Sequence, residues 1–379
     1  MAFTGTDWGR RVLLTGLSPS ATLSGFVALV SLDNVPVEAI DAGGNSALNG
    51  GGDLRFSTDD QGVNQLPLEV VSYVTNASAP SRSCQLWIRF PTYASGTREV
   101  YMFYKKAAET QPAVGAAFGR NAVWSDTAMS YRLEDKVTNS AGGTSLTEVG
   151  TVNTVTGEIG DGQQITSNSN YLDTGISPSI SDGAVSLWAK PTNITATASF
   201  IFTDRTSTGE YFQVAITPTG KVNTRVASSS NQVETANNAL TIGVWSHIVV
   251  TWGAGGIAIY VDGVSSATGP YTGSWISNSN IMIGHTDAFA LPFIGDVDEI
   301  ALFNVQHDSD YISSEYDNQS GPAAFWTTGT PETPSGGGVT VTPQDINSAQ
   351  TISLPSLTQN YIFSVDNIIS SQLISQPTF

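Results

Sequence analysis

Hydrophobic residues along this chain gather in short runs that glycine, proline, asparagine and aspartate interrupt. The clearest example is residues 243–264, where two runs rich in Val, Ile, Trp and Tyr flank the glycine-rich residues 253–256, and the second run stops at Asp262 and Gly263. Glycine adopts the positive φ that tight turns need, so this pattern predicts a β-hairpin followed by a second reversal. Apolar side chains occupy both faces of residues 245–252, which is typical of a strand in the middle of a two-layer sandwich.

Similar short runs cover most of the chain, and helical periodicity is confined to a short segment at residues 308–316. The 379 residues are enough for two domains of ordinary size. A content of 37 glycines together with few charged residues indicates many turns. The sequence therefore predicts an all-β protein with two β-sandwich (jelly-roll) domains and an extended C-terminal repeat arm.

Turn signals and changes of composition divide the chain into four parts. Residues 1–129 are predicted to form the first β-sandwich, and residues 130–326 the second. Residues 327–338 are rich in Thr, Pro and Gly, which predicts an extended and mobile linker. Residues 339–379 form the repeat arm.

Two similar stretches lie inside the arm, because residues 348–357 parallel residues 370–379. Each copy offers one short alternating strand that a proline stops. Two short copies bury no core by themselves, so we expect the arm to dock on another molecule, by oligomerisation with a trimer favoured or by adding strands to a partner's sheet. A floppy tail is the alternative. The repeats look like those at the ends of some tailed-phage structural proteins.

Three blocks in the second part of the chain carry a resemblance to a known family. Residues 245–252 read Trp-Ser-His-Ile-Val-Val-Thr-Trp, residues 260–263 read Tyr-Val-Asp-Gly, and residues 295–300 read Gly-Asp-Val-Asp-Glu-Ile. In this order they closely resemble the LamG-like modules, which are jelly rolls of the concanavalin A type. The resemblance implies a surface that binds sugars or proteins more often than it performs chemistry.

The first part resembles a domain of uncharacterised function that often precedes LamG-type modules in bacterial and phage surface proteins. The pattern opens with Trp8, Arg10 and Arg11, and continues with Gly-Gly-Asp-Leu-Arg-Phe at residues 51–56 and Leu-Trp-Ile-Arg at residues 86–89. This resemblance implies no activity. Arg10 and Arg11 also look superficially like a twin-arginine export signal, but we favour a first strand there, because polar residues interrupt the apolar run that follows. A start without a signal favours a protein that leaves its cell by lysis, as virion proteins do.

The charge balance narrows the possible partners. The chain has 15 Lys and Arg against 33 Asp and Glu, a formal net charge of −18. This surface would repel a phosphate backbone, so we expect no nucleic-acid partner, and anionic membranes are disfavoured for the same reason. The sequence has no apolar run of about 18 residues, so we expect no membrane insertion. Cys84 is the single cysteine, which leaves no internal disulfide framework.

Catalysis is the first chemistry to consider, because some enzymes with the concanavalin fold hydrolyse glycans. Strand spacing places Asp296 and Asp298 on one face with Cα atoms roughly 6.5 Å apart, while Glu299 points away. Retaining glycosidases need two carboxyl groups about 5–5.5 Å apart across the sugar, and this segment departs from their usual pattern. Ser246 and His247 are adjacent on a strand and face opposite ways, so no nucleophilic pair is supported. We therefore expect no enzyme.

A structural calcium ion is the second possibility that the resemblance implies, since concanavalin-type modules often hold one. Calcium needs six to eight oxygen ligands, and Asp298, helped by Asp173 or Asp296, would supply the side-chain ligands. The alternative, which we favour, is that Asp298 accepts hydrogen bonds from neighbouring loop amides. Otherwise we expect no cofactor.

Sugar binding needs aromatic rings on loops, where they stack on pyranose rings beside hydrogen-bonding groups. Tyr211, Tyr271, Trp275 and Phe289 lie in connections rich in Ser, Gly, Thr and Asn, and they are the candidate ligand-binding residues. The alternative is that each packs over the edge of the sandwich. The strand tryptophans Trp188, Trp245 and Trp252 are assigned to the core.

The combined expectation is a non-enzymatic structural or adhesion protein on the exterior of a tailed-phage virion, as a tail fibre, tail-tip protein or capsid decoration. Its LamG-like domain would bind host surface glycan, and residues 339–379 would attach it to other virion proteins. A bacterial secreted or cell-surface carbohydrate-binding adhesin is the main alternative. A glycan-degrading enzyme is a third possibility.

Overall fold

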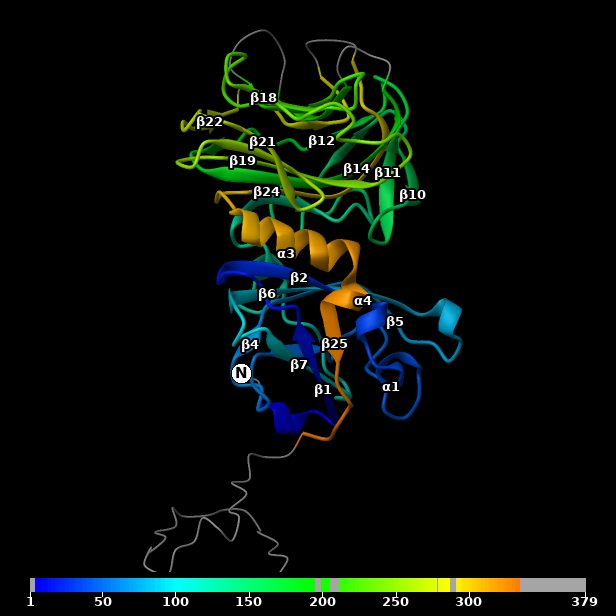
Figure 1. The fold of residues 1–379 in the computed structure, drawn as a ribbon. Helices are drawn as coiled ribbons and strands as arrows, with labels where there is room; N and C mark the ends of the chain where they lie inside the picture. The colour runs from blue at the N-terminus through cyan, green and yellow to red at the C-terminus, as the bar shows by residue number, and fades with distance from the viewer. Residues whose placement is uncertain (1–3, 195–198, 205–210, 278, 287–290, 335–379) are drawn as a thin grey trace, which may run out of the picture. The chain divides into compact units, whose positions relative to one another are not determined.

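The computed structural model describes residues 4–194, 199–204, 211–277, 279–286 and 291–334. Antiparallel sheets dominate this part of the chain, and the helices are few and short (Figure 1). The all-β class predicted from the sequence is confirmed. None of the helices in these ranges is long and apolar enough to cross a membrane. The predicted repeat arm lies outside the described residues.

The first sandwich packs a five-stranded sheet against a three-stranded sheet. Val12 and Leu14 lie on one sheet and Phe26 and Leu86 on the other, and all four share one buried core. The five-stranded sheet has the order β25 (Trp326–Thr328), β1 (Arg10–Gly16), β7 (Glu99–Tyr104), β3 (Arg55–Ser57) and β4 (Gln65–Leu66), and the three-stranded sheet has the order β2 (Leu23–Ser31), β6 (Ser83–Tyr93) and β5 (Leu68–Val74). The short helical segments are η1 (Gly5–Asp7), η2 (Leu32–Asn34), α1 (Val37–Ile40), η3 (Ala79–Ser81) and α2 (Arg120–Val123).

The second sandwich packs an eight-stranded sheet against a seven-stranded sheet, with Ile248 and Val250 of the first and Phe202 and Val214 of the second in one core. The eight-stranded sheet has the order β10 (Asn153–Thr156), β11 (Asp161–Ile165), β24 (Ile294–Phe303), β14 (Gly183–Asn193), β19 (Ser246–Trp252), β20 (Ile257–Val261) and β21 (Val264–Gly269), and β8 (Thr127–Tyr131) also pairs with β24. The seven-stranded sheet has the order β18 (Gln232–Glu234), β17 (Val222–Arg225), β16 (Gln213–Ile216), β15 (Ser199–Thr203), β23 (Met282–Ile283), β12 (Tyr171–Asp173) and β9 (Thr147–Val149), while β13 (Ser179–Ile180) pairs with β22 (Trp275–Ile276).

The hairpin predicted at residues 243–264 is confirmed. Strand β19 pairs antiparallel with β20, and β14 lies on its other side, so β19 is central in the sheet. Gly253 and Gly256 adopt φ of +145° and +88° in the turn, conformations that glycine reaches without steric cost. Trp245 differs from the prediction, because it precedes β19 and is partly exposed, with its ring 5.0 Å from Nζ of Lys190.

Helix α3 (Ser309–Ser320) begins where the sequence predicts a helix and lies between the two sandwiches (Figure 1). The carboxylate of Asp308 caps it by accepting from the backbone N–H of Tyr311 at 2.9 Å. Tyr311 belongs to the core of the first sandwich, where its ring packs edge-on against Phe26 at 5.4 Å. Ile312, on the next position, packs with Val249 of the second sandwich. One helix therefore supplies core residues to both sides.

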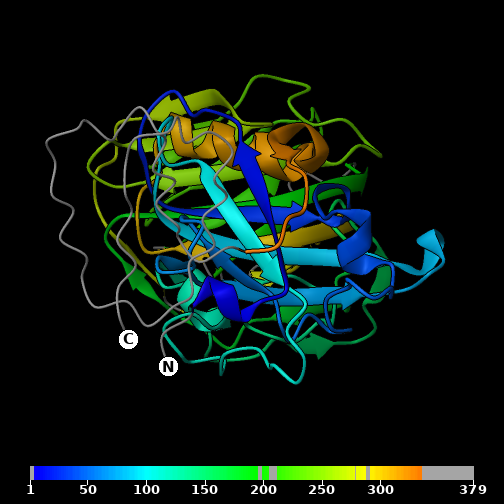
Figure 2. The same ribbon diagram turned by 90° about the horizontal axis from the view of Figure 1, so that it is seen from below.

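After α3 the chain returns to the first sandwich. It passes through α4 (Pro322–Phe325) into β25, which pairs with β1 in the register Leu14↔Thr328. The backbone N–H of Arg11 then donates to the carbonyl of Glu332 at 2.9 Å. Residues 327–334 of the predicted linker are thus folded onto the first sandwich. In the view from below, the blue and cyan strands of the first sandwich lie in front of the green strands of the second (Figure 2).

Candidate functional site

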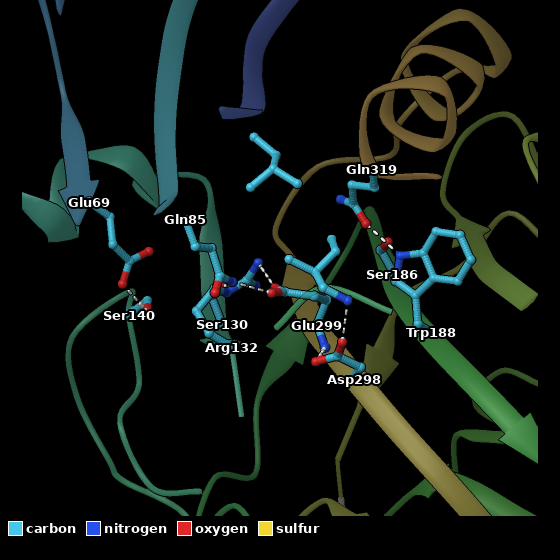
Figure 3. A network of polar contacts seen from close by, with 12 residues as sticks. Glu69, Gln85, Ser130, Arg132, Ser140, Ser186, Trp188, Asp298, Glu299 and Gln319 are labelled. Atoms are coloured by element: carbon cyan, nitrogen blue, oxygen red, sulfur yellow. Dashed lines mark hydrogen bonds and ion pairs between the residues drawn. The ribbon is translucent and has the colours of Figure 1, made fainter. Parts of the chain in front are cut away.

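Helix α3 occupies the outer face of the eight-stranded sheet. Trp188 on β14 donates from Nε1 to Oε1 of Gln319 at 2.7 Å (Figure 3). Ser186 on the same strand donates to Oε1 of Glu315 at 3.1 Å. His247 on β19 lies beside them, 2.9 Å from the Ser186 hydroxyl and fully buried. Because helical side chains fill this area, this part of the sheet serves contacts within the molecule.

A buried charged cluster lies at the join between the sandwiches. Arg132, which follows β8, pairs with the carboxylate of Glu299 on β24 and donates from Nη2 to Ser130 Oγ at 2.6 Å (Figure 3). Gln85 on β6 of the first sandwich donates to the same Glu299 carboxylate at 2.9 Å. The Arg132 guanidinium also lies 4.1 Å from the ring centroid of Trp124, a cation–π contact. Glu299 thus contacts both Arg132 of the second sandwich and Gln85 of the first.

Three further carboxyl groups surround this pair. Glu69 on β5 accepts from Trp124 Nε1 at 2.7 Å and from the Ser140 hydroxyl. Burial raises the pKa of Glu69, raises the pKa values of Asp298 and Glu299 well above their usual range, and raises the pKa of Glu134 to about 7. Glu69, Asp298 and Glu299 are at most 4% exposed, so a polymer has no direct access to these three carboxyl groups, whereas Glu134 is partly exposed.

A β-bulge places Glu299 in this cluster. Strict alternation predicts that Glu299 points opposite to Asp298, but the register with β14 shifts by one residue between Ser186 and Trp188. Glu299 takes a positive φ of +48°, and Val297 and Ile300 face the core instead. Two residues rather than one therefore separate the core-facing positions, which frees Glu299 to reach Arg132.

The three aspartates considered for calcium do not come together. Asp298 accepts from the backbone N–H of Ile159 at 2.9 Å and of Glu299 at 2.8 Å, as the alternative of amide hydrogen bonds predicts. Asp296 pairs with Lys190 at 2.7 Å, and Asp173 lies in the other sheet. Among the described residues, no three acidic, histidine or cysteine side chains converge in a way that could hold a metal ion. Asp173, Asp296 and Asp298 therefore do not act together as one set of side-chain ligands.

The structure separates the four aromatic candidates. Trp275 is fully buried in the second core, where Nε1 donates to Oδ2 of Asp204 at 2.9 Å. Tyr271 is partly buried, and its hydroxyl donates to the carbonyl of Ser274 at 2.8 Å. Tyr211 is 2% exposed. Phe289 lies outside the described residues. Trp275 and the Tyr211 ring thus pack into the protein, which is the alternative that the sequence left open.

A Trp275→Phe variant tests this placement. Removing the indole N–H leaves the buried Asp204 carboxylate without one of its donors, so we expect a loss of about 1–3 kcal/mol in the free energy of unfolding. Urea unfolding followed by fluorescence measures the loss. Tyr271→Phe, which removes one partly exposed hydroxyl, is the matched control and is expected to lose less. An unchanged free energy for Trp275→Phe would contradict the buried contact.

A row of bonded polar side chains lies on the face of β17 and β18 opposite to the core, and buried Tyr211, which precedes β16, adjoins it. We call the row the polar ladder: Tyr211, Asn223, Arg225, Gln232 and Glu234, of which Tyr211 and Asn223 are buried. Arg225 donates from Nη1 to the Tyr211 hydroxyl at 2.6 Å, and from Nε and Nη2 to Oε1 of Gln232 at 2.8 and 2.6 Å. Gln232 and Asn223 donate to Oε1 of Glu234 at 2.8 and 2.7 Å. These bonds fix each side chain in place.

The ladder faces outward because its neighbours face the core. Val222 and Val233 belong to the second core, so the alternating positions on each strand point to the other side of the sheet. Gln232 is exposed, and Arg225 and Glu234 are partly exposed. Sequence reasoning selected Tyr211 and missed its partners, although the alternation of polar residues with these two valines was a usable signal. Fixed amide, guanidinium and carboxylate groups suit hydrogen bonding to hydroxyls.

Comparisons with solved structures return protein chains of low sequence identity. Domain 4 of AbnA, an extracellular arabinanase from Geobacillus stearothermophilus solved with arabinotriose, is 17% identical, covers 50% of this chain and 98% of its own, and has a TM-score of 0.43. The CBM40 of the Ruminococcus gnavus IT-sialidase bound to α2,3-sialyllactose is 16% identical, covers 41% and 96%, and has a TM-score of 0.35. The binding domain of Paraclostridial Mosquitocidal Protein 1 is 13% identical, covers 51% and 52%, and has a TM-score of 0.43.

No curated protein sequence matches this chain. A family model does match part of it, over residues 160–313, which include β11 and β24 of the eight-stranded sheet and the whole polar ladder. The matched family is described as the concanavalin A-like lectin/glucanases superfamily. Residues 160–313 are therefore similar to domains of the concanavalin A-like lectin/glucanases superfamily.

Proposed function

We propose that the protein is a non-enzymatic carbohydrate-binding adhesion protein, and that the polar ladder is the centre of its glycan-binding surface. One observation carries the proposal: α3 fills the outer face of one sheet of the second sandwich, while the other sheet presents ordered polar groups outward. Partly exposed Arg225 and exposed Gln232 supply donors, and Glu234 supplies acceptors, for sugar hydroxyls. The net charge of −18 favours a neutral glycan over an acidic one.

Binding without turnover is part of this proposal. The superfamily description names glucanases beside lectins. In this chain the acidic segment on β24 is engaged inside the protein, since Asp298 and Glu299 are buried and Asp296 pairs with Lys190. Incubating the protein with host capsule or lipopolysaccharide and assaying for new reducing ends tests this point. Appearance of reducing ends would overturn the non-enzymatic assignment.

An Arg225→Ala variant tests the glycan-binding surface. Loss of the guanidinium removes direct donors and also releases Gln232 and the Tyr211 hydroxyl. We therefore expect weaker binding, with a dissociation constant for host-surface glycan at least tenfold higher. Binding of the full chain to a glycan array, followed by titration calorimetry on the best glycan, measures the change. Arg98→Ala, at a partly exposed arginine of the first sandwich, is the control and is expected to bind normally. Equal affinity in both variants would place the site elsewhere.

We further propose that the protein is displayed on the exterior of a tailed-phage virion and is attached through residues 339–379. The sequence resemblances of the first domain and of the C-terminal repeat support this placement. A chain lacking residues 339–379 should stay folded and bind glycan but fail to enter particles, as followed by immunoblot of purified virions. Incorporation of the shortened chain would contradict the attachment. Mass spectrometry that finds a processed N-terminus would instead favour the secreted bacterial adhesin.

A further inference from the structure

We propose that the charged cluster around Arg132 is a proton-dependent latch, which holds the two sandwiches together at neutral and mildly acidic pH and loosens as the pH rises. The latch consists of Glu69, Arg132, Glu134, Asp298 and Glu299. Its Glu299 on β24 of the second sandwich accepts from Gln85 on β6 of the first, and its Glu69 on β5 accepts from Ser140, which follows β8. It goes beyond glycan binding, because it concerns how the domain that carries the polar ladder is held.

The latch brings four carboxyl groups close to only a few cationic side chains. Exposure is 4% for Glu69, 0% for Asp298 and 3% for Glu299, and one carboxyl oxygen of Glu134 is buried as well. Facing these four carboxyl groups are the Arg132 guanidinium and, from α2, Arg120, which acts on Glu69. Full ionisation would therefore bury four negative charges against two positive ones.

The neighbouring elements do not correct this imbalance. Asp161 on β11 adds another acid near Glu134, to which its backbone N–H donates at 3.0 Å. Glu315 on α3 is buried against Ser186, and its pKa is raised to about 7. His247 faces it from β19, but burial lowers the pKa of that imidazole to about 3, so it supplies no positive charge near neutral pH. Apart from α2, which supplies Arg120, these neighbouring elements thus add acid or stay neutral.

Buried like charges repel strongly, so some of these carboxyl groups must keep protons in the folded protein. A carboxyl group whose pKa is raised by folding binds more protons in the folded state than in the unfolded state. Its contribution to stability is complete below the unfolded pKa and is lost as the pH rises through the folded pKa. Glu134 and Glu315, with pKa values of about 7, set the start of that window. Buried His247 acts in the opposite sense below about pH 6.5, so the test lies above pH 7.

The cluster can exchange protons with solvent. A cavity of about 170 Å³ borders it, lined by Glu69, Arg120, Arg132, Glu134 and Ser140 among others. Opening of the join would expose the backbone N–H of Ile159, which donates to Asp298, while the core strands of each sandwich stay closed. Local opening and global unfolding therefore leave different signatures.

The test compares the full chain with Glu299→Gln, which mimics the protonated carboxyl, and with Glu99→Gln as a control at an exposed carboxyl of the first sandwich. Thermal unfolding from pH 7 to pH 9 should show the folding constant of the unmodified chain falling by up to tenfold per pH unit for each retained proton. Glu299→Gln should fall less steeply, and Glu99→Gln should match the unmodified chain. Glu134→Gln, at a less buried position, serves if Glu299→Gln does not fold.

Hydrogen–deuterium exchange distinguishes a latch from general destabilisation. At pH 9, after correction for intrinsic exchange, amides of residues 157–161 should exchange faster than at pH 7, while those of β16 and β17 keep their protection. Equal pH slopes in the unmodified chain and Glu299→Gln, or loss of protection in all strands together, would overturn the latch.

Discussion

A Trp326→Ala variant is expected to lose about 3–5 kcal/mol of unfolding free energy, the usual cost of removing a buried tryptophan side chain. Trp326 opens β25 and is 3% exposed. Its ring stacks on Phe90 with centroids 6.3 Å apart, and Nε1 donates to the carbonyl of Leu29 at 2.8 Å. Both partners belong to the first sandwich. The loss is therefore expected in the first sandwich, whose other strands all precede the second sandwich in the sequence.

Urea unfolding monitored by far-ultraviolet circular dichroism measures this loss. Trp245→Ala is the matched control, because Trp245 is partly exposed and stands outside both cores, so its loss is expected to stay below about 1.5 kcal/mol. If Trp326→Ala were no more destabilising than Trp245→Ala, the return of the chain to the first sandwich would add nothing to its core.

Local pattern was sufficient for the fold class and for individual hairpins. The glycines around residues 253–256 and the alternation of residues 245–252 act between neighbours in sequence, so the β19–β20 hairpin could be predicted correctly. The short helix near residue 308 was likewise visible from its own sequence. Such features depend on turn sterics and side-chain periodicity alone.

The return of the chain to the first sandwich through β25 could not be predicted from local pattern. Residues 327–334 have the composition of a linker, and nothing within them indicates that β25 pairs with β1. The same limit applies to α3, whose Tyr311 and Ile312 enter two different cores. Pairing with distant partners is set by shapes that exist only after both sandwiches form. Composition therefore misses it.

The candidate sites likewise include features that local sequence predicts and features that depend on residues distant in sequence. Ser, Gly and Thr around Trp275 resemble a loop, yet its indole is buried, because an Asp204 carboxylate distant in sequence accepts its N–H. The bulge at Glu299 likewise breaks the alternation from which its direction was predicted. The polar ladder, by contrast, follows simple alternation on β17 and β18. It was within reach of the sequence.

The second large effect is expected for Arg132→Met, a substitution that keeps much of the side-chain volume and removes the charge. The variant leaves the buried Glu299 carboxylate without its paired guanidinium and removes the positive charge that acts on buried Glu69 and Asp298, and such losses cost about 3–5 kcal/mol. Urea unfolding at pH 8 measures the loss, with Arg98→Met as the partly exposed control. A loss below about 1 kcal/mol in Arg132→Met would mean that the acids alone hold the join.

A double-mutant cycle with Glu299→Gln locates the origin of that cost. If the cost arises from an uncompensated carboxylate, the double variant should be less destabilised than the sum of the single variants, with a coupling of about 1–3 kcal/mol at pH 8. The coupling should shrink at pH 5.5, because protonated Glu299 carries no charge for Arg132 to balance. Additive losses at both pH values would assign the cost to the stacking of Arg132 on Trp87 and Trp124 instead. Packing contacts do not titrate, whereas a charge pair does, so the pH dependence of the coupling decides between them.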